Sequence, residues 1–569
     1  VDAVREWSAR FSAWLLIVAV AWFGIVGLVL LGPEVVRLLV ENQGQRAVRI
    51  GQIVSGIVGV ISGLVTLRAG HSAGTPATQR PAGTPMNLPL LLAAPVFVVF
   101  LVGLFGWAGR ALIGTVESLA TQLPVIGPES FLTAPDWVRP SLIAIAGGVS
   151  GALRAVMKPG AVGYIVTSIV VPLILIWFGS WTATRVDTNK FSLHAMYRAR
   201  LIRAYLGASR PAGERDPNPF TGFDPLDNIW MKDLWPPPGA PFIPPGPRLM
   251  HVVNVALNLV GGGNLAWQQR KAESFTFSPL YCGAYNQGYR RTRRPKDDRR
   301  RSYGGADGIT LGTAMTISGA AVSPNMGYHS STVISFLMTL FNVRLGWWLG
   351  NPGHAGAKVY EQSSPDSSLR LILDEAQGHT DNKHPYVYLS DGGHFENLGL
   401  YEMILRRCHT IVVSDAGCDP SGSFEDLGNA IRKIRVDFGI PIEFQEIKIY
   451  PRVPGEPPTA GKYCAIGTIR YSCVDNDADD GTLIYIKPAF YGTEPKDVFN
   501  YAQTSSAFPH ESTADQFFSE SQFESYRALG SHAIDQILGS QPTGVEPQFT
   551  PIGRLVRRAG DYVRQGGSA

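Results

Sequence analysis

The segment 386–415 constrains the fold of this chain of 569 residues most strongly, because strand, turn and helix signals follow one another in it. Residues 386–390 have the composition of a β-strand, and the Asp-Gly-Gly sequence at 391–393 favours a sharp turn. An apolar pattern of helical period covers 397–408, and the β-branched run 410–413 favours a second strand. Two strands joined by a helix are typical of a parallel, buried sheet. The segment therefore predicts a βαβ unit and an α/β domain.

Asp391 stands where the first of these strands ends. In open α/β sheets the carboxyl ends of parallel strands face the ligand crevice, so a carboxylate at this position is a candidate site residue. Gly392 and Gly393 leave room for other groups to approach it. A structural role is the alternative, in which the Asp391 side chain accepts hydrogen bonds from the amides of the turn. Spacing alone supports both roles equally.

Four long uncharged segments lie in the first third of the chain, at 11–32, 50–67, 88–109 and 160–184. Each has between 18 and 25 residues, and about 20 apolar residues suffice to cross the ~30 Å hydrocarbon core of a bilayer as a helix. A mean hydropathy of +0.05, with only 17% charged residues, also exceeds that of an average soluble enzyme. The sequence thus predicts an α-helical transmembrane block.

Positive charges cluster directly after the last predicted span, and such a cluster favours the cytoplasmic side for the residues that follow. The cluster consists of Arg185, Lys190, Arg198, Arg200 and Arg203. Five cysteines without a CxxC pair favour reduced thiols in a cytosolic domain. The small net charge of +4 gives no reason to expect nucleic acid as a partner.

The predicted organisation has four parts. A transmembrane helical region covers 1–185, and an amphipathic helix with a Pro-rich connection covers 186–250. The globular α/β part follows at 251–545, and a polar tail covers 546–569. The apolar face of the amphipathic helix, near 191–206, favours docking either on the globular part or on a bilayer surface.

Two motifs carry a resemblance to a known family. The heptapeptide DGGHFEN at 391–397 fits the pattern D-G-[GA]-x-x-x-N, and the small-residue segment ISGAA lies ahead of it at 317–321. In both the chain resembles the patatin-like phospholipases, and residues 508–530 are similar to the tail of their large bacterial membrane-attached members. The resemblance covers about residues 186–540.

The resemblance implies a three-layer α/β domain with a central, mostly parallel sheet. It also implies a lipid acyl hydrolase of the phospholipase or lysophospholipase type, which uses a Ser-Asp dyad and needs neither a metal nor an organic cofactor. Asp391 matches the aspartate of the dyad, and Gly392, Gly393, His394 and Asn397 match the turn and its supporting residues. We accordingly expect an integral protein of the bacterial inner membrane, with a cytoplasmic catalytic domain and membrane lipids as substrate.

The nucleophile of that family stands in a G-x-S-x-G motif, and its oxyanion loop reads G-G-x-R. The chain has no G-G-x-R loop, and its nearest match to the serine motif is GVSGA at 148–152. Ser150 is therefore a weak nucleophile candidate, since small residues among membrane spans more often serve helix packing. We expect the serine in a segment ahead of Val1 or in a companion chain. The alternative is a non-catalytic membrane protein that uses the fold as an interaction module.

Overall fold

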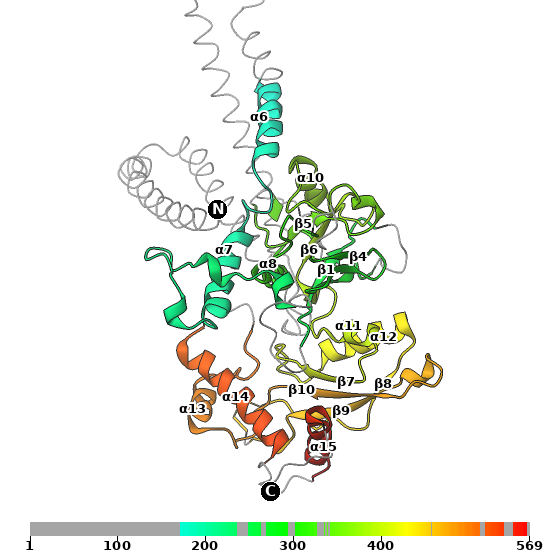
Figure 1. Cartoon of the computed structure of the whole chain (residues 1–569). Helices are drawn as coiled ribbons and strands as arrows, with labels where there is room; N and C mark the ends of the chain where they lie inside the picture. Colours follow the sequence, from blue (N-terminus) through cyan, green and yellow to red (C-terminus); the bar gives the residue numbers. More distant parts are fainter. Residues whose placement is uncertain are drawn as a thin grey trace, which may run out of the picture.

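The computed structural model describes the chain from residue 171 onward, with gaps. The described residues are 171–235, 249–262, 269–293, 302–326, 335, 338–339, 342–453, 455–456, 458–512, 518–539 and 550–565. Figure 1 shows two β-sheets, one beyond the other along the molecule, with helices beside and between them.

The larger sheet has six strands in the order β4-β3-β2-β1-β6-β5, and all of its neighbouring pairs are antiparallel. β6 lies between β1 and β5, so that Ala256 is opposite Ser390 and Trp347 is opposite Leu389. The strands are β1 (Val253–Asn258), β2 (Ala272–Phe277), β3 (Tyr281–Ala284), β4 (Gly288–Arg291), β5 (Trp347–Gly350) and β6 (Tyr386–Ser390).

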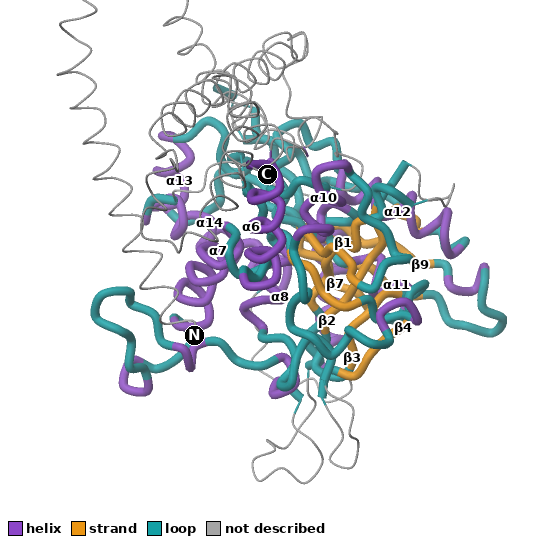
Figure 2. Tube along the Cα trace, turned by 90° about the horizontal axis from the view of Figure 1, so that it is seen from above, coloured by secondary structure: helices purple, strands orange, loops and turns teal. Residues whose placement is uncertain are grey.

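Helices cover both faces of this sheet. On one face, Ala314 and Ile317 of α8 pack in the same buried cluster as Val255 and Leu389, and α7 packs against α8 (Figure 2). On the other face, α10 places Leu371 against aromatic rings of β5 and β6. The alternation of buried side chains between the two faces follows the two-residue period of a strand. The helices are α6 (Val171–Arg185), α7 (Leu193–Leu201), α8 (Leu311–Ser318) and α10 (Leu369–Gln377).

The smaller sheet has four strands in the order β7-β10-β9-β8 and is mixed. β7 and β10 are parallel, whereas β10–β9 and β9–β8 are antiparallel. Its strands are β7 (Thr410–Ser414), β8 (Ile442–Phe444), β9 (Cys464–Ile469) and β10 (Gly481–Ile486).

Five helices accompany the smaller sheet. Figure 1 shows α11 and α12 on the side that faces the larger sheet, while α15 lies on the opposite side and contacts β9 and β10. The helices are α11 (Leu400–Leu405), α12 (Glu425–Phe438), α13 (Lys496–Thr504), α14 (Glu520–Leu538) and α15 (Pro551–Arg564). Thus the segment predicted as a polar tail contains a helix of the packed body.

The predicted α/β domain with a central, mostly parallel sheet is wrong. The strand, helix and strand expected in 386–415 are present as β6, α11 and β7, but β6 belongs to the antiparallel sheet and β7 to the mixed one. Both edges of β6 are occupied by antiparallel neighbours, so it cannot pair with β7. A fully buried strand has the same apolar composition in either kind of sheet, and composition therefore did not reveal this pairing.

The expectation of an integral membrane protein with a transmembrane block is also corrected. Among the helices that the structure describes, none combines the length and the apolar character needed to cross a bilayer. α6, with 15 residues, is the described part of the span predicted at 160–184, and residues 160–170 lie outside the described residues. The spans predicted at 11–32, 50–67 and 88–109 lie outside the described residues.

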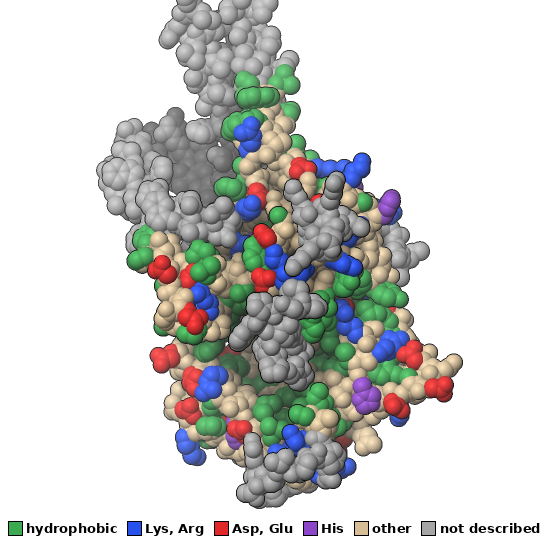
Figure 3. Space-filling view, in the orientation of Figure 1, with side chains coloured by type: hydrophobic (Ala, Val, Ile, Leu, Met, Phe, Trp, Pro, Cys, Tyr) green, Lys and Arg blue, Asp and Glu red, His purple; other side chains and the backbone are tan. Residues whose placement is uncertain are grey.

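α6 nevertheless carries apolar side chains on its surface. Figure 3 shows hydrophobic side chains along this helix, and Ile174, Trp177 and Phe178 are each more than half exposed. The helix is tied to the body at its last turn, where the backbone N–H and the hydroxyl of Ser368 both donate to Ala183 O.

Candidate functional site

Asp391 follows β6 directly and begins a short 3-10 turn, Gly392–His394. Its Oδ1 accepts the backbone N–H of Gly393 at 2.7 Å, which is the hydrogen bond of an Asx turn. The sharp turn expected from the sequence is therefore confirmed. The strand before it is antiparallel, so the cavity that Asp391 lines is not the crevice at the edge of a parallel sheet. Residues of α7 and α8 line this cavity together with the turn.

This cavity has a volume of about 610 Å³ and takes its walls from four parts of the chain. These are α7 with the π-helical turn Ile202–Gly207, α8, the residues that lead into β1, and the turn after β6. The apolar part of the wall consists of Leu201, Leu206, Val252, Val253, Leu311, Met315 and Leu398. The polar part includes Tyr197, Tyr205, His251, Asn254, Ser318, Asp391, Glu396 and Asn397.

Burial controls the protonation of Asp391. The side chain is half-buried in the cavity wall, and this environment raises the pKa of its carboxyl to about 7, against a smaller lowering by the Gly393 N–H. Burial also raises the pKa of the Tyr197 hydroxyl, and the nearby charge of Asp391 adds to that effect. Asp391 can therefore take up and release a proton near neutral pH, as a general base requires.

Ser318 brings a hydroxyl into the same cavity from the last turn of α8. Its Oγ donates to the backbone oxygen of Asn254 at 2.7 Å. A Cβ atom on Gly392 would lie 3.9 Å from Ser318 Oγ and 3.0 Å from Asn254 O. Glycine at 392 thus lets the turn approach β1 and α8 closely, as the sequence suggested.

Close contact between Gly393 and Asn397 also restricts the conformation of the turn. A Cβ atom on Gly393 would overlap with Asn397 Oδ1 and lie only 3.0 Å from Asp391 Oδ1. Asn397 is held in place because its Nδ2 donates to Asp426 Oδ1 at 2.7 Å. The last residue of the DGGHFEN motif therefore fixes the turn that carries Asp391.

His394 does not line the cavity. It is buried, and its Nδ1 lies 2.7 Å from Ser390 Oγ, which also accepts Asn258 Nδ2–H at 2.7 Å. These contacts join the turn to β6 and β1, which is a supporting role as expected.

Glu396 lines the cavity, but both of its carboxylate oxygens accept backbone N–H groups, from Leu398 and from Tyr401. Burial raises the pKa of the Glu396 carboxyl. The two backbone hydrogen bonds and the positive charge of Lys433 offset part of this increase.

Two further residues do not line the cavity in the described structure. Asp415 directly follows β7 in the smaller sheet, where its Oδ2 accepts hydrogen bonds from Lys487 Nζ at 3.0 Å and from the Tyr485 hydroxyl. Ser150 lies outside the described residues. Within the described part of the chain, no group of three His, Cys, Asp or Glu side chains is arranged to hold a metal ion.

No separate signal in the sequence marks Asn254 and Tyr197 as cavity residues. Asn254 interrupts the apolar run at the start of β1, and Tyr197 was expected only on the apolar face of an amphipathic helix. α7 packs on the globular part, since it contacts α8 and contributes Tyr197 and Leu201 to the cavity, whereas Leu193, Met196 and Tyr205 of that face are exposed. The sequence did contain one indication of a polar site, because the amphipathic helix carries tyrosines, and each tyrosine has a hydroxyl group.

Comparisons of the chain with protein-family models, with curated proteins and with solved structures find no significant match.

Proposed function

We propose that this cavity is the active site of a serine-type acyl-ester hydrolase in which Asp391 acts as the general base. The observation that carries the proposal is the half-buried Asp391 carboxyl, whose pKa of about 7 lets it exchange a proton at neutral pH inside a cavity of about 610 Å³. A carboxylate in such a position can activate a hydroxyl without an intervening imidazole.

The lining of the cavity supports an ester with an apolar acyl chain as substrate. Leu201, Val253 and Met315 offer an apolar surface, while Asp391 and Asn397 lie together in the polar part. A lipid acyl ester likewise has an apolar part and a polar part, because its hydrocarbon chain needs an apolar environment and its ester group a polar one. The resemblance to patatin-like phospholipases points to the same substrate class.

In the proposed reaction, serine Oγ attacks the ester carbonyl carbon while Asp391 takes the hydroxyl proton. Asp391 then gives this proton to the departing alcohol, and the carbon–oxygen bond to that alcohol breaks. Water attacks the acyl-serine next, Asp391 takes a proton from it, and the proton returns to serine Oγ as the acid leaves.

We assign the nucleophile to a serine outside the described residues. Ser318 lies in the cavity, yet its hydroxyl donates to Asn254 O, and this bond ties it to the backbone of β1. Ser318 would have to give up that bond before it could pass its proton to Asp391. A serine from a preceding segment, from a companion chain or at Ser150 remains the prediction.

A fluorophosphonate probe tests the proposal on the full chain and on any longer form of it. Probe labelling and hydrolysis of a p-nitrophenyl acyl ester are measured for the wild type and for Asp391→Asn, with Asp307→Asn as the matched exposed control. We expect Asp391→Asn to lower both rates by about 10²–10⁴-fold, and the wild-type rate to rise with pH with a midpoint near 7. Asp307→Asn should retain both rates.

Mass spectrometry of the labelled peptide then identifies the nucleophile. Labelling at Ser318 that is lost in Ser318→Ala would contradict the assignment outside the described residues, and the same experiment with Ser150→Ala tests the weak candidate. Equal rates in the wild type and in Asp391→Asn would overturn the role of Asp391. A complete absence of labelling and hydrolysis would instead favour a non-catalytic interaction module.

A further inference from the structure

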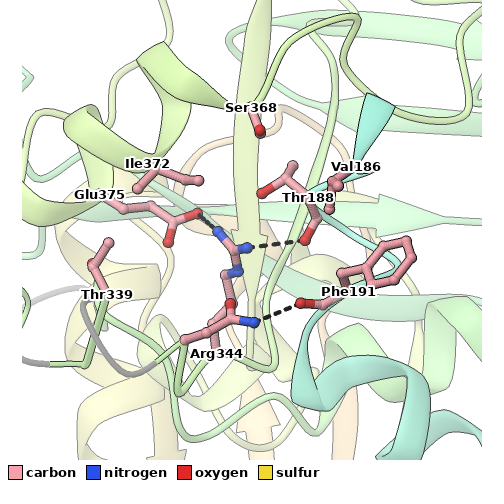
Figure 4. A pocket seen from close by; sticks show the side chains of 9 residues that line it. Val186, Thr188, Phe191, Thr339, Arg344, Ser368, Ile372 and Glu375 are labelled. Atoms are coloured by element: carbon pink, nitrogen blue, oxygen red, sulfur yellow. Dashed lines mark hydrogen bonds and ion pairs between the residues drawn. The ribbon is translucent and has the colours of Figure 1, made fainter. Parts of the chain in front are cut away.

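A second, smaller cavity lies between the segment that follows α6, the helix α10 and the residues that lead into β5. Its volume is about 170 Å³, and it shares no lining residue with the Asp391 cavity. Figure 4 shows Thr188, Arg344 and Glu375 turned toward one another from these three parts of the chain. Phe191 and Asn342, both exposed, stand at the side where the cavity meets solvent.

Two charged side chains are buried in its wall. Arg344 is 5% exposed and Glu375 is fully buried, and Arg344 Nη1 lies 2.8 Å from Glu375 Oε1. The remaining contacts of the pair are Arg344 Nη2 to Thr188 O at 2.9 Å and Trp348 Nε1 to Glu375 Oε1 at 2.5 Å. The two charges compensate each other, so the cavity favours a neutral occupant over an ion.

Three polar atoms of this cluster are buried and lack a hydrogen-bond partner among the described residues. They are Glu375 Oε2, Arg344 Nε and Thr188 Oγ1. A carboxylate oxygen accepts, a guanidinium Nε–H donates, and a hydroxyl does both. Buried polar groups in folded proteins are nearly always paired, so three such atoms around one cavity indicate an occupant with both donors and acceptors.

The rest of the wall restricts the occupant further. Val186, Phe191 and Ile372 offer carbon surface to a short hydrocarbon skeleton. A volume of about 170 Å³ corresponds to roughly five waters at about 30 Å³ each, or to one small organic molecule. A polyol of three or four carbons satisfies these conditions, because each of its hydroxyl groups is both donor and acceptor.

We infer that the cavity formed by Thr188, Arg344, Glu375 and Ile372 is a binding site for a small neutral polyol. One hydroxyl of the ligand donates to Glu375 Oε2, and ligand oxygens accept from Arg344 Nε and Thr188 Oγ1. The site is independent of the proposed hydrolase activity, since none of its residues contributes to the Asp391 cavity.

Glycerol titrated into the full chain, with binding followed by saturation-transfer NMR, tests this site. We expect saturable binding with a dissociation constant of about 10 mM or lower, a range open to a ligand of six non-hydrogen atoms. Thr188→Val keeps the shape and the backbone acceptor of Arg344 but removes the hydroxyl, and it should weaken binding about fivefold. Thr182→Val is its matched control outside the cavity and should bind as the wild type does.

A second pair of variants keeps the test independent of the buried charges. Ile372→Phe fills the cavity and should abolish binding, whereas Leu373→Phe places the same ring on an exposed neighbour outside the lining and should not. Near-UV circular dichroism checks that both variants are folded. Equal binding to Ile372→Phe and the wild type, an absence of saturation, or tighter binding of acetamide than of glycerol would overturn the polyol site.

Discussion

The carboxyl group of Asp391 combines two properties that oppose each other. It must be charged to accept a proton from a hydroxyl, and the same burial that raises its pKa to about 7 makes the charged form unfavourable in the folded protein. The turn compensates only in part, through the N–H of Gly393, whose hydrogen bond to the carboxylate lowers this pKa. A general base that works at neutral pH is therefore expected to reduce the stability of the protein that carries it.

Asp391→Asn should raise the stability of the protein at alkaline pH. Because the folded pKa of about 7 exceeds the ordinary value of 3.8, the folded state binds the proton more tightly, and wild-type stability falls as pH rises between these values. Asparagine is neutral throughout. Between pH 4 and pH 8 the free energy of unfolding should shift in favour of Asp391→Asn by up to about 4 kcal/mol. Urea unfolding at both pH values measures the difference in the free energy of unfolding between the wild type and Asp391→Asn. The same difference at pH 4 and at pH 8 would contradict the raised pKa.

Gly393→Ala should destabilise the protein by about 1–3 kcal/mol, because the added methyl group overlaps with Asn397 Oδ1 and must displace it from the turn. Gly428→Ala is the matched control. It lies inside α12 with open space around its Cβ position, and there the same substitution should stabilise by about 0.5–1 kcal/mol. Chemical denaturation of the two variants gives both values, and equal effects would argue against a turn fixed by Asn397.

At the scale of the elements, strands and helices were easier to predict than their partners. Tyr386–Ser390 is a strand with the predicted bounds, and the strand predicted at 410–413 corresponds to β7. The partners of β6 come from residues more than 30 positions away, at Val253–Asn258 and Trp347–Gly350. Local composition carries no information on such pairings, and this is why a βαβ unit was expected where two sheets meet.

The parallel pair β7 and β10 brings charges into the interior of the smaller sheet. Lys487, directly after β10, contacts Asp415 at 3.0 Å and Asp419 at 3.8 Å, and all three side chains are at least nine-tenths buried. Tyr485 of β10 donates to the same Asp415 oxygen. The pair ties the ends of two strands together, and each charge depends on the other for compensation.

Lys487→Met should therefore destabilise the protein by about 3–5 kcal/mol, since it leaves Asp415 buried without its cation. Asp415→Asn added to Lys487→Met removes that charge and should restore about 2 kcal/mol or more. Lys232→Met breaks a pair whose partner Asp307 is 61% exposed, and it should cost less than about 1 kcal/mol. Denaturation midpoints of the four proteins test this. A double variant less stable than Lys487→Met would contradict the conclusion that Lys487 compensates the buried charge of Asp415.

At the scale of the whole molecule, the two sheets have separate hydrophobic cores, and both polar contacts and a small apolar cluster of Ala256, Ala272, Phe395 and Tyr401 connect them. Val255, Phe275 and Leu389 belong to the core of the larger sheet, and Ile434 and Leu483 to that of the smaller one. Between them, Arg270 of the segment before β2 lies 2.6 Å from Asp437 of α12. This division was not visible in the sequence, because both cores use the same kinds of apolar strand. The DGGHFEN motif was visible because Asp and Gly are rare inside such runs.

Each half of the molecule also contains a buried histidine whose pKa is lowered. His194 of α7 is fully buried against Trp347, and its Nδ1–H donates to Leu345 O at 2.6 Å. Burial lowers its pKa to about 3. His510 lies beside Asp419 in the smaller half, and burial together with the charge of Lys487 lowers its pKa to about 4. Protonation of either ring is thus far more favourable in the unfolded chain, whose histidines titrate near 6.5.

Both halves should therefore lose stability in acid, and through different residues. Each folded pKa lies below the unfolded value, so the stabilisation is complete above pH 6.5 and is lost as pH falls toward 4. Between pH 7.5 and 4.5, His194→Gln and His510→Gln should each lose about 2–3 kcal/mol less than the wild type, and the double variant about twice that. His409→Gln, on an exposed ring, should lose as much as the wild type. Urea unfolding at the two pH values decides this: an acid loss that persists in the double variant would place its origin outside the two histidines.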